Sequence, residues 1–246
     1  MIKNTRARHQ SGFTLVELMV GMLLGLILIA GIFTVYISTK KTNNTTEGVI
    51  TAQSGAQLAI NFMKEDIART GWVNNSSLSY SLSSPLTADY AALDGGIASD
   101  TLKVHYESCD ASSPLNECDA NGLDVADCNG VAVAPGAIIT NVYALNADNE
   151  LTCNGQPLIN NVTDFQVLYG ELTPSGLQYV TANNISDSSK IHSIRFGILV
   201  TSDNDTSDSN ISRAVNLLDQ TINLNDKKLH LKYESTVVVY NRPHGI

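Results

Sequence analysis

The chain has 246 residues, 43% of them hydrophobic, a composition typical of a folded protein and not of a disordered one. Fifteen lysines and arginines stand against 24 aspartates and glutamates, which gives a formal net charge of -9. This charge excludes a basic surface of the kind that attracts nucleic acid, so no nucleic-acid partner is indicated.

Residues 13–37 form an almost unbroken apolar run in which Glu17 is the only charged residue. A helix of this length, at about 1.5 Å per residue, crosses a hydrocarbon core of roughly 30 Å. The run therefore predicts a membrane-spanning helix. Three basic residues precede the run and favour a cytoplasmic N-terminus, so the rest of the chain is expected outside the cytoplasm.

Two simpler interpretations of the run fail to explain Glu17. A secretory signal peptide would have a shorter apolar core of roughly 7 to 15 residues and a small-residue cleavage site, and neither is present. A plain membrane anchor leaves the carboxylate unexplained, because placing it in the bilayer costs about 2.5 to 3.5 kcal/mol. Either a partner offsets this cost or the carboxylate is protonated in the lipid, and the sequence leaves both possibilities open.

Residues 12–17 read Gly-Phe-Thr-Leu-Val-Glu. This hexapeptide resembles the cleavage and methylation motif of type IV prepilins, which pilins share with the pseudopilins of type II secretion. The resemblance implies that a prepilin peptidase cuts after Gly12, removes residues 1–12 as a leader and N-methylates Phe13. It also implies that Glu17 pairs with the terminal amine of a neighbouring subunit, since opposite charges attract strongly in a low dielectric.

The resemblance further implies an α+β fold, in which a long N-terminal helix packs on an antiparallel β-sheet domain. Residues 13–40 would form its membrane-spanning and filament-core half, and residues 41–71 its amphipathic second half. Apolar residues recur in this second half at three- and four-residue intervals: Val49, Ala52, Ala56, Ile60, Met63 and Ile67. Poor helix formers at residues 42–48 predict an interruption of the helix, and Gly71 predicts its end.

From residue 72 to residue 246 the pattern changes to short alternating runs separated by Ser, Asn, Asp and Gly, which predicts β-strands joined by loops. The clearest strands are expected at residues 101–107, 162–169, 191–201 and 229–240. We expect one sheet packed on the helix, within a single globular domain of residues 72–246. Two blocks, at residues 162–170 and 235–242, are similar to the PilW-type minor pilins.

This similarity implies a minor pilin, a low-copy subunit of a tip or priming complex that initiates pilus assembly, with no enzymatic activity and no cofactor. Its implied partners are other minor pilins, the major pilin, the prepilin peptidase and the inner-membrane assembly platform. The protein would span the bacterial inner membrane through residues 13–37, with its C-terminus in the periplasm, and then enter the pilus at the cell surface. A type II secretion pseudopilin resembling the J component is the alternative.

Four cysteines lie close together in the sequence, with spacings that match no zinc site: Cys109, Cys118, Cys128 and Cys153. Outside the cytoplasm such cysteines are expected to form disulfides. Three pairings are possible. We favour nearest neighbours, Cys109 with Cys118 and Cys128 with Cys153, because these close the shortest loops.

A membrane-tethered periplasmic enzyme is a more remote alternative. Ser38 and Lys41 fit the S-x-x-K signature of serine β-lactamases and residues 202–204 fit S-D-N, but the third signature, K-T-G, is missing. Three histidines stand singly in expected strands, which is typical of surface or core histidines: His105, His192 and His230.

Two acidic clusters offer oxygen atoms of the type that calcium binds. One consists of Asp203, Asp205 and Asp208, and the other of Asp119, Asn121 and Asp124. Neither follows the EF-hand spacing. Solvated loops are the favoured interpretation, because these residues are common in turns, and no metal site is assigned.

Overall fold

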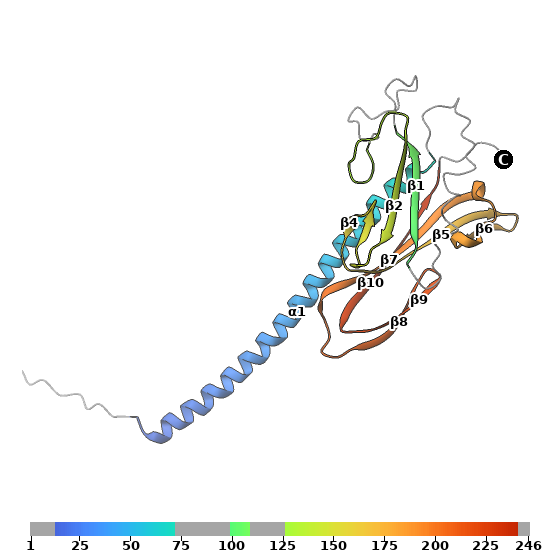
Figure 1. Cartoon of the computed structure of the whole chain (residues 1–246). Coiled ribbons are helices and arrows are strands. Elements are labelled where there is room, and N and C mark those ends of the chain that lie inside the picture. Colours follow the sequence, from blue (N-terminus) through green and yellow to red (C-terminus); the bar gives the residue numbers. More distant parts are fainter. Residues whose placement is uncertain (1–12, 72–98, 109–125, 241–246) are drawn as a thin grey trace, which may run out of the picture. The chain divides into compact units, whose positions relative to one another are not determined.

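The computed structural model describes residues 13–71, 99–108 and 126–240. Its elements, shown in Figure 1, are α1 (Leu15–Arg69), β1 (Thr101–Glu107), β2 (Ile138–Leu145), β3 (Leu151–Cys153), β4 (Gln156–Ile159), β5 (Val162–Thr173), β6 (Gly176–Val180), the 3-10 helices η3 (Ala182–Asn184) and η4 (Ser188–Lys190), β7 (Ile191–Asp205), β8 (Ile211–Leu217), β9 (Gln220–Asp226) and β10 (Lys228–Val238). The chain divides into two compact units between Thr46 and Glu47.

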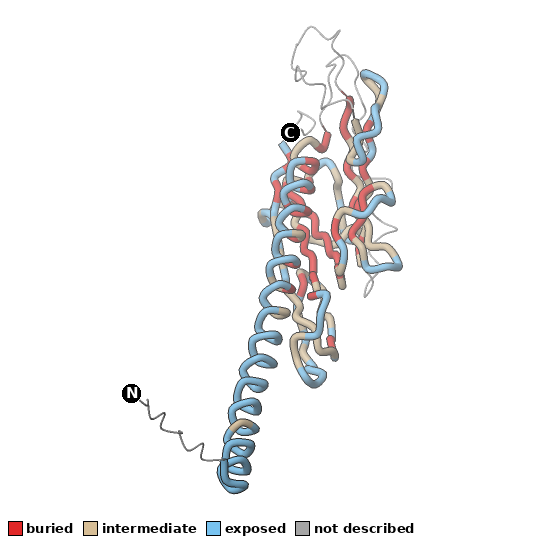
Figure 2. The backbone as a smooth tube through the Cα atoms, turned by 90° about the vertical axis from the view of Figure 1, so that its left-hand side faces the viewer, coloured by how far each residue is buried: buried red, intermediate tan, exposed pale blue. Residues whose placement is uncertain are grey.

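In the first unit, the large apolar side chains of residues 13–37 are exposed. Figure 2 shows this part of α1 in the colour of exposed residues. Within the described ranges, α1 is the one helix long and apolar enough to cross a membrane. A continuous apolar surface of this size is unsuited to water, so it requires lipid or other apolar surfaces around it.

α1 continues without a break through residues 42–48, so the predicted interruption is wrong. The threonines of this stretch satisfy their hydroxyl groups on the helix itself. The Oγ1 atoms of Thr42, Thr45 and Thr46 donate to the carbonyl oxygens four residues earlier, at 3.0, 3.0 and 2.9 Å. These local hydrogen bonds keep the polar stretch compatible with a helix.

The end of α1 agrees with the prediction from Gly71. The last helical residue is Arg69, and Gly71 adopts a φ of 78°. A glycine in this left-handed conformation commonly follows a helix, because other residues meet a steric cost there. The N–H of Gly71 then donates to the carbonyl oxygen of His105 at 2.9 Å, which ties the helix end to β1.

The strands form two four-stranded sheets and a two-stranded hairpin, so the prediction of a single sheet is wrong. The first sheet has the order β1-β2-β3-β4 and the second sheet the order β10-β7-β5-β6, while β8, among the strands that the structure describes, pairs only with β9. All these strand pairs are antiparallel.

Asp100, the residue before β1, contacts β5 of the second sheet. Its N–H donates to the carbonyl oxygen of Phe165 in β5 at 2.7 Å, as a strand neighbour would. The N–H of Val167, however, donates to the carboxylate of Asp100 at 2.8 Å and not to a backbone carbonyl. The carboxylate therefore takes the place of a backbone carbonyl at this position, and the contact joins the first sheet to β5 of the second.

One hydrophobic core lies between both sheets and the part of α1 that belongs to the second unit. The predicted apolar stripe of the helix is buried, except for Val49, which is half-buried. Figure 2 shows the buried residues gathered where this part of α1 lies along the strands. The largest fully buried side chains include Tyr143, Phe165, Tyr169, Phe196 and Met63.

The β8–β9 hairpin builds a second, smaller core, in which Leu217 and Leu224 pack with Leu199 of β7. Neighbouring residues of a strand point to opposite faces of a sheet, so Leu199 faces away from the main core that holds Ile198. The hairpin thus lies on the outer face of the second sheet (Figure 1). A Cβ atom on Gly197 would lie only 2.8 Å from Leu217, so this glycine allows the close approach.

Two glycine-to-alanine substitutions should change stability in opposite directions. At Gly170 a Cβ atom would clash with Oγ of Ser193 and lie 3.3 Å from its backbone oxygen, so Gly170→Ala should lower the free energy of unfolding by about 1 to 3 kcal/mol. At Gly55 the nearest atom, on Ile159, would lie at 3.6 Å, an ordinary contact. Gly55→Ala should therefore raise the free energy of unfolding by up to about 1 kcal/mol through helix propensity.

Urea denaturation of the full chain in detergent micelles measures both changes against the wild type. A Gly170→Ala variant as stable as the wild type would contradict the tight packing described for β5, β6 and β7.

Candidate functional site

The start of α1 places Thr14 and Glu17 in mutual contact. Oε2 of Glu17 accepts hydrogen bonds from the N–H and the Oγ1 of Thr14, at 3.4 and 3.3 Å. In return, Oγ1 of Thr14 accepts the N–H of Glu17 at 3.3 Å. This reciprocal arrangement is a capping box, which satisfies N–H groups that the first turn of a helix leaves unpaired.

The capping box gives the carboxylate of Glu17 hydrogen bonds within its own chain, but it does not supply an opposite charge. The positive end of the helix dipole favours a carboxylate here, while the neighbouring side chains of Leu15, Val16 and Leu18 are apolar and exposed. Phe13 lies next to this first turn, and Gly12 lies outside the described residues. Glu17 therefore remains able to pair with a cation from outside its own helix.

A second polar cluster, which the sequence analysis missed, surrounds Asp66 near the other end of α1. Asp66 is only 6% exposed. Its carboxylate accepts the hydroxyl of Tyr143 at 2.6 Å and Nδ2 of Asn141 at 2.9 and 3.0 Å. Nδ2 of Asn141 also contacts the hydroxyl of Tyr106 at 3.3 Å. The cluster fixes the end of α1 to β1 and β2.

Burial determines how the groups of this cluster ionise. Burial raises the pKa of Asp66 above its usual value, against the opposing effects of its hydrogen bonds and of the charge on Arg69. Burial, together with the nearby Asp66 carboxylate, raises the pKa of Tyr106 to about 12. The same causes raise the pKa of Tyr143 further. Both tyrosines therefore remain protonated donors at neutral pH.

Cys128 and Cys153 form a disulfide with their Cα atoms 6.3 Å apart, which is the pairing favoured from the sequence. Cys109 and Cys118 lie outside the described residues. Cys153 is fully buried and stands opposite Tyr143 in the pairing of β2 with β3. The disulfide is therefore next to the strand that supplies the hydrogen-bond donors of the Asp66 cluster.

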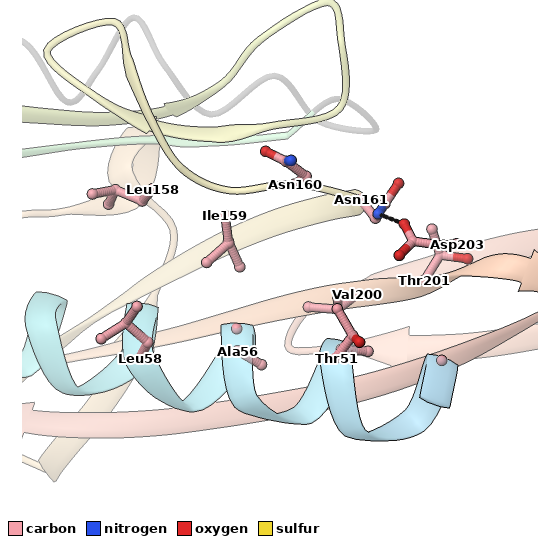
Figure 3. A pocket seen from close by; sticks show the side chains of 13 residues that line it. Thr51, Ala56, Leu58, Leu158, Ile159, Asn160, Asn161, Val200, Thr201 and Asp203 are labelled. Carbon is pink, nitrogen blue, oxygen red and sulfur yellow. Dashed lines mark hydrogen bonds between the residues drawn. The ribbon is translucent and has the colours of Figure 1, made fainter. Parts of the chain in front are cut away.

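Two hollows open along the helix in the second unit. The first, of about 240 Å³, lies between α1 and the segment that joins β4 to β5. Figure 3 shows Leu58 and Leu158 at one end, and Asn161, which donates to Asp203, at the other. This hollow is thus apolar at one end and polar at the other.

The second hollow, of about 300 Å³, lies over the Asp66 cluster. It is lined by residues from α1, from β1 and β2, and from the loop that carries Cys128; these include Phe62, Asp66, Arg69, Tyr106, Cys128 and Asn141. The hollow therefore gives access from the surface to both the carboxylate and the disulfide.

The part of the chain that the structure describes contains no group of side chains arranged as calcium ligands. No three histidine, cysteine, aspartate or glutamate side chains gather there as metal ligands, and this includes Asp203, Asp205 and Asp208. Asp203 and Asp205 belong to β7 and not to a loop. The other cluster, Asp119, Asn121 and Asp124, lies outside the described residues.

The residues of the β-lactamase-like matches have structural contacts. Ser38 and Lys41 belong to the first unit, on α1, and the carbonyl oxygen of each accepts a threonine hydroxyl. Ser202 belongs to the second unit, where its hydroxyl donates to the carbonyl oxygen of Asn204 and accepts the N–H of Leu229.

The three histidines are also held by neighbouring groups. Nδ1 of His105 contacts Thr140 Oγ1 at 2.9 Å, and Nδ1 of His192 contacts the carbonyl oxygen of Lys190 at 2.8 Å. Nε2 of His230 contacts the carboxylate of Asp226 at 2.7 Å. These contacts fit structural histidines in a β-sheet domain.

Comparison with known proteins finds family matches over two parts of the chain. Residues 133–241 match the family described as type IV pilus-assembly protein W, and residues 7–33 match the prokaryotic N-terminal methylation motif. Both regions are thus similar to families of type IV pilin-related proteins. Among solved structures, the chain is similar to a type IV-like pilin from Thermus thermophilus, at 14% identity and a TM-score of 0.46, over 77% of this chain and 97% of that one. Among curated proteins, no sequence matches it.

The two family matches agree with the features built up above. The structure itself has the long N-terminal helix and the antiparallel β-domain that the sequence predicts. The methylation motif covers Phe13 and Glu17, and it implies processing by a prepilin peptidase. Together with the apolar helix, it indicates membrane anchoring and association with a pilus.

The raised pKa of Asp66 predicts a pH-dependent stability. Because folding raises this pKa above the ordinary value of 3.8, the stabilisation is complete below that value and is lost as the pH rises through the folded-state pKa. The wild type should therefore lose stability relative to Asp66→Asn as the pH rises from about 4 to about 7.

Urea midpoints of both proteins in detergent micelles, over this pH range, measure the effect. Glu65→Gln is the matched control, because Glu65 is the adjacent acid on α1 and its side chain is 71% exposed. A stability difference between wild type and Asp66→Asn that stays constant with pH would show that Asp66 is not the titrating group.

Proposed function

We propose that this chain is a type IV pilin-like protein and a minor pilin, a low-copy subunit of a tip or priming complex that initiates pilus assembly. The observation that carries the proposal is the combination of two matches in one chain. An N-terminal methylation motif at residues 7–33 precedes a region, residues 133–241, that matches type IV pilus-assembly protein W. The first match supports processing and the second supports a role in assembly.

The chemistry of the N-terminus supports incorporation into a filament. Cleavage after Gly12 removes residues 1–12 and leaves a cationic amine on Phe13, which is then methylated. A carboxylate in apolar surroundings costs about 2.5 to 3.5 kcal/mol on membrane-insertion scales. The capping box gives Glu17 hydrogen bonds but no positive charge, so the amine of a neighbouring subunit offsets this cost when the apolar helices pack together.

The proposed location follows from the same features. Residues 13–37 hold the precursor in the bacterial inner membrane, with the β-domain in the periplasm, until the subunit enters the pilus at the cell surface. The disulfide in the β-domain supports a periplasmic location for this domain, because disulfides persist in oxidising compartments. The proposed partners are the other minor pilins, the major pilin, the prepilin peptidase and the inner-membrane assembly platform.

Analysis of sheared pili tests this proposal. Pili from the bacterium that makes this protein should contain it at far lower copy than the major subunit, with methylated Phe13 as its first residue. Without the prepilin peptidase, the full precursor should remain in the membrane. Mass spectrometry of both fractions measures the N-terminus and the copy number.

The same experiment separates the minor pilin from its alternative, a type II secretion pseudopilin resembling the J component, since pseudopilins carry the same motif. A pseudopilin would be processed at Phe13 yet absent from pili, and its deletion would abolish secretion and not piliation. A mature chain that begins at any other residue would refute both assignments.

The roles of charge and capping at Glu17 can be separated by two substitutions. Glu17→Gln removes the charge but keeps an acceptor for the capping box, which glutamine also completes. Thr14→Val keeps the charge but removes the hydroxyl of the box. If charge pairing drives assembly, Glu17→Gln should reduce incorporation into pili by at least about tenfold, and Thr14→Val should reduce it much less.

Quantitative immunoblots of sheared pili, normalised to the membrane-bound precursor, measure incorporation of both variants. Equal losses for the two variants would assign the role of Glu17 to helix capping and contradict charge pairing between subunits.

A further inference from the structure

Asn141 connects the disulfide to the carboxylate on α1. It is fully buried in β2. Its Oδ1 accepts the backbone N–H of Cys128 at 3.0 Å, and its Nδ2 donates to both oxygens of Asp66 at 2.9 and 3.0 Å. An amide can serve both groups only in one orientation, with its oxygen toward the disulfide and its nitrogen toward the helix.

The two ends of the disulfide flank the two donors of Asp66. Cys128 contacts Asn141 through its N–H, and Cys153 stands opposite Tyr143 across the β2–β3 ladder. Asn141 and Tyr143 are two residues apart in β2, so they point to the same face of the sheet. The covalent bond therefore fixes the surroundings of both side chains that hold Asp66.

The loop of residues 126–132 has few other ties to β2 and β3 among the described residues. Most of its hydrogen bonds are internal; the N–H groups of Asn129 and Val131, for example, donate to Oδ1 of Asp127. Besides Cys128, the loop receives a longer hydrogen bond, 3.3 Å, from Asn154 in the turn after β3 to Asp127. The disulfide therefore ties the loop to β3, while the residues that follow the loop, 134–137, are held by hydrogen bonds to Ser108.

A reductant can reach one sulfur of this bond. Cys128 is partly exposed and lines the hollow of about 300 Å³ over Asp66, whereas Cys153 is fully buried. Thiol–disulfide exchange requires access to one sulfur atom by an attacking thiolate. The geometry makes Cys128 the sulfur that is attacked.

We propose that the Cys128–Cys153 disulfide is a redox latch: closing it orients Asn141 toward Asp66 and locks the end of α1 onto the first sheet, and opening it releases that end. This inference is independent of the proposed function, because it concerns the fold of the second unit alone. It assigns to the disulfide a specific effect on the helix in addition to general stabilisation.

The redox step is an ordinary thiol–disulfide exchange. To open the latch, a dithiol reductant attacks Sγ of Cys128 as a thiolate, and Cys153 leaves as a thiolate that takes up a proton. The second thiol of the reductant then releases Cys128, so the reductant loses two electrons and becomes a disulfide. Closing is the reverse reaction, in which a disulfide-bearing oxidant accepts two electrons from Cys128 and Cys153.

Opening the latch changes the environment of Asp66. Without the disulfide, the loop is free to move away from Asn141. Oδ1 of Asn141 then loses its hydrogen bond from the N–H of Cys128 and keeps the longer contact, 3.5 Å, from Nδ2 of Asn154. The hollow then widens to water, which hydrates the carboxylate. Burial is the main cause of the raised pKa of Asp66, so hydration favours the ionised form of its carboxylate. Water can then replace the hydrogen-bond donors that β2 supplies.

Hydrogen exchange of the full chain in detergent micelles tests the latch. The variant Cys128→Ser/Cys153→Ser should exchange amide hydrogens at residues 60–69 roughly tenfold faster than the wild type, with no change at residues 211–226 of the β8–β9 hairpin. The matched control, Cys109→Ser/Cys118→Ser, should leave residues 60–69 unchanged. Dithiothreitol should reproduce the change in the wild type and in the control, and reoxidation should reverse it.

Combination with Asn141→Ala distinguishes a latch from a general staple. If Asn141 carries the effect, Asn141→Ala alone should also accelerate exchange at residues 60–69 roughly tenfold, and adding it to the cysteine variant should produce little further change. Asn146→Ala, in the turn after β2, is the control for loss of an asparagine in the same sheet.

Two results would overturn the latch. The first is that the effects of the cysteine and Asn141 substitutions multiply, which would show that they act separately. The second is that the cysteine variant also loses protection in the β8–β9 hairpin, which would make the disulfide a staple for the whole domain.

Discussion

Two carboxylates in apolar surroundings, Glu17 and Asp66, set the requirements for the rest of the molecule. A buried or lipid-exposed carboxylate is tolerated only where hydrogen bonds or an opposite charge compensate it. Asp66 receives its donors from β2, so its compensation is complete only when α1 is docked on the first sheet. Among the described residues, Glu17 receives its donors from Thr14, in the first turn of its own helix, and these carry no positive charge. One helix thus carries an acid that is held by the fold and an acid whose proposed partner is the amine of a neighbouring subunit.

The side chains of α1 follow this division. In the second unit the buried face carries small residues, among them Gly48, Ala52 and Ala56, which let the helix backbone approach the strands closely. In the first unit the corresponding surface carries large apolar side chains without protein cover. The hydroxyl groups of the threonines between these parts donate hydrogen bonds to carbonyl oxygens of their own helix. Each part of the helix is therefore suited to one kind of neighbour.

The sequence predicts those features that depend on local pattern. The apolar stripe of α1, the helix end at Gly71 and the bounds of β1 follow from periodicity, backbone freedom and alternation, and the structure has all three. The division into two sheets could not be predicted, because it depends on contacts between residues far apart in the chain, such as the hydrogen bond from the N–H of Val167 to the carboxylate of Asp100. The buried cluster around Asp66 could have been predicted. Asp66 lies three residues after Met63, on the apolar face of α1, where a buried carboxylate requires hydrogen-bond donors.

The disulfide and the Asp66 cluster cannot be assigned separate contributions to stability. Closing a loop between cysteines 25 residues apart stabilises a fold by about 3 kcal/mol in the chain-entropy model, and a buried hydrogen bond to a charged group by about 1.5 to 3 kcal/mol. These values add only for groups that share no neighbours, and here Asn141 contacts both Cys128 and Asp66. The oxidation state of the cysteines therefore determines how firmly the carboxylate, and with it the end of α1, is held. In a chain whose methylation motif and apolar helix indicate anchoring in a membrane, this coupling makes docking of the helix depend on an oxidising compartment.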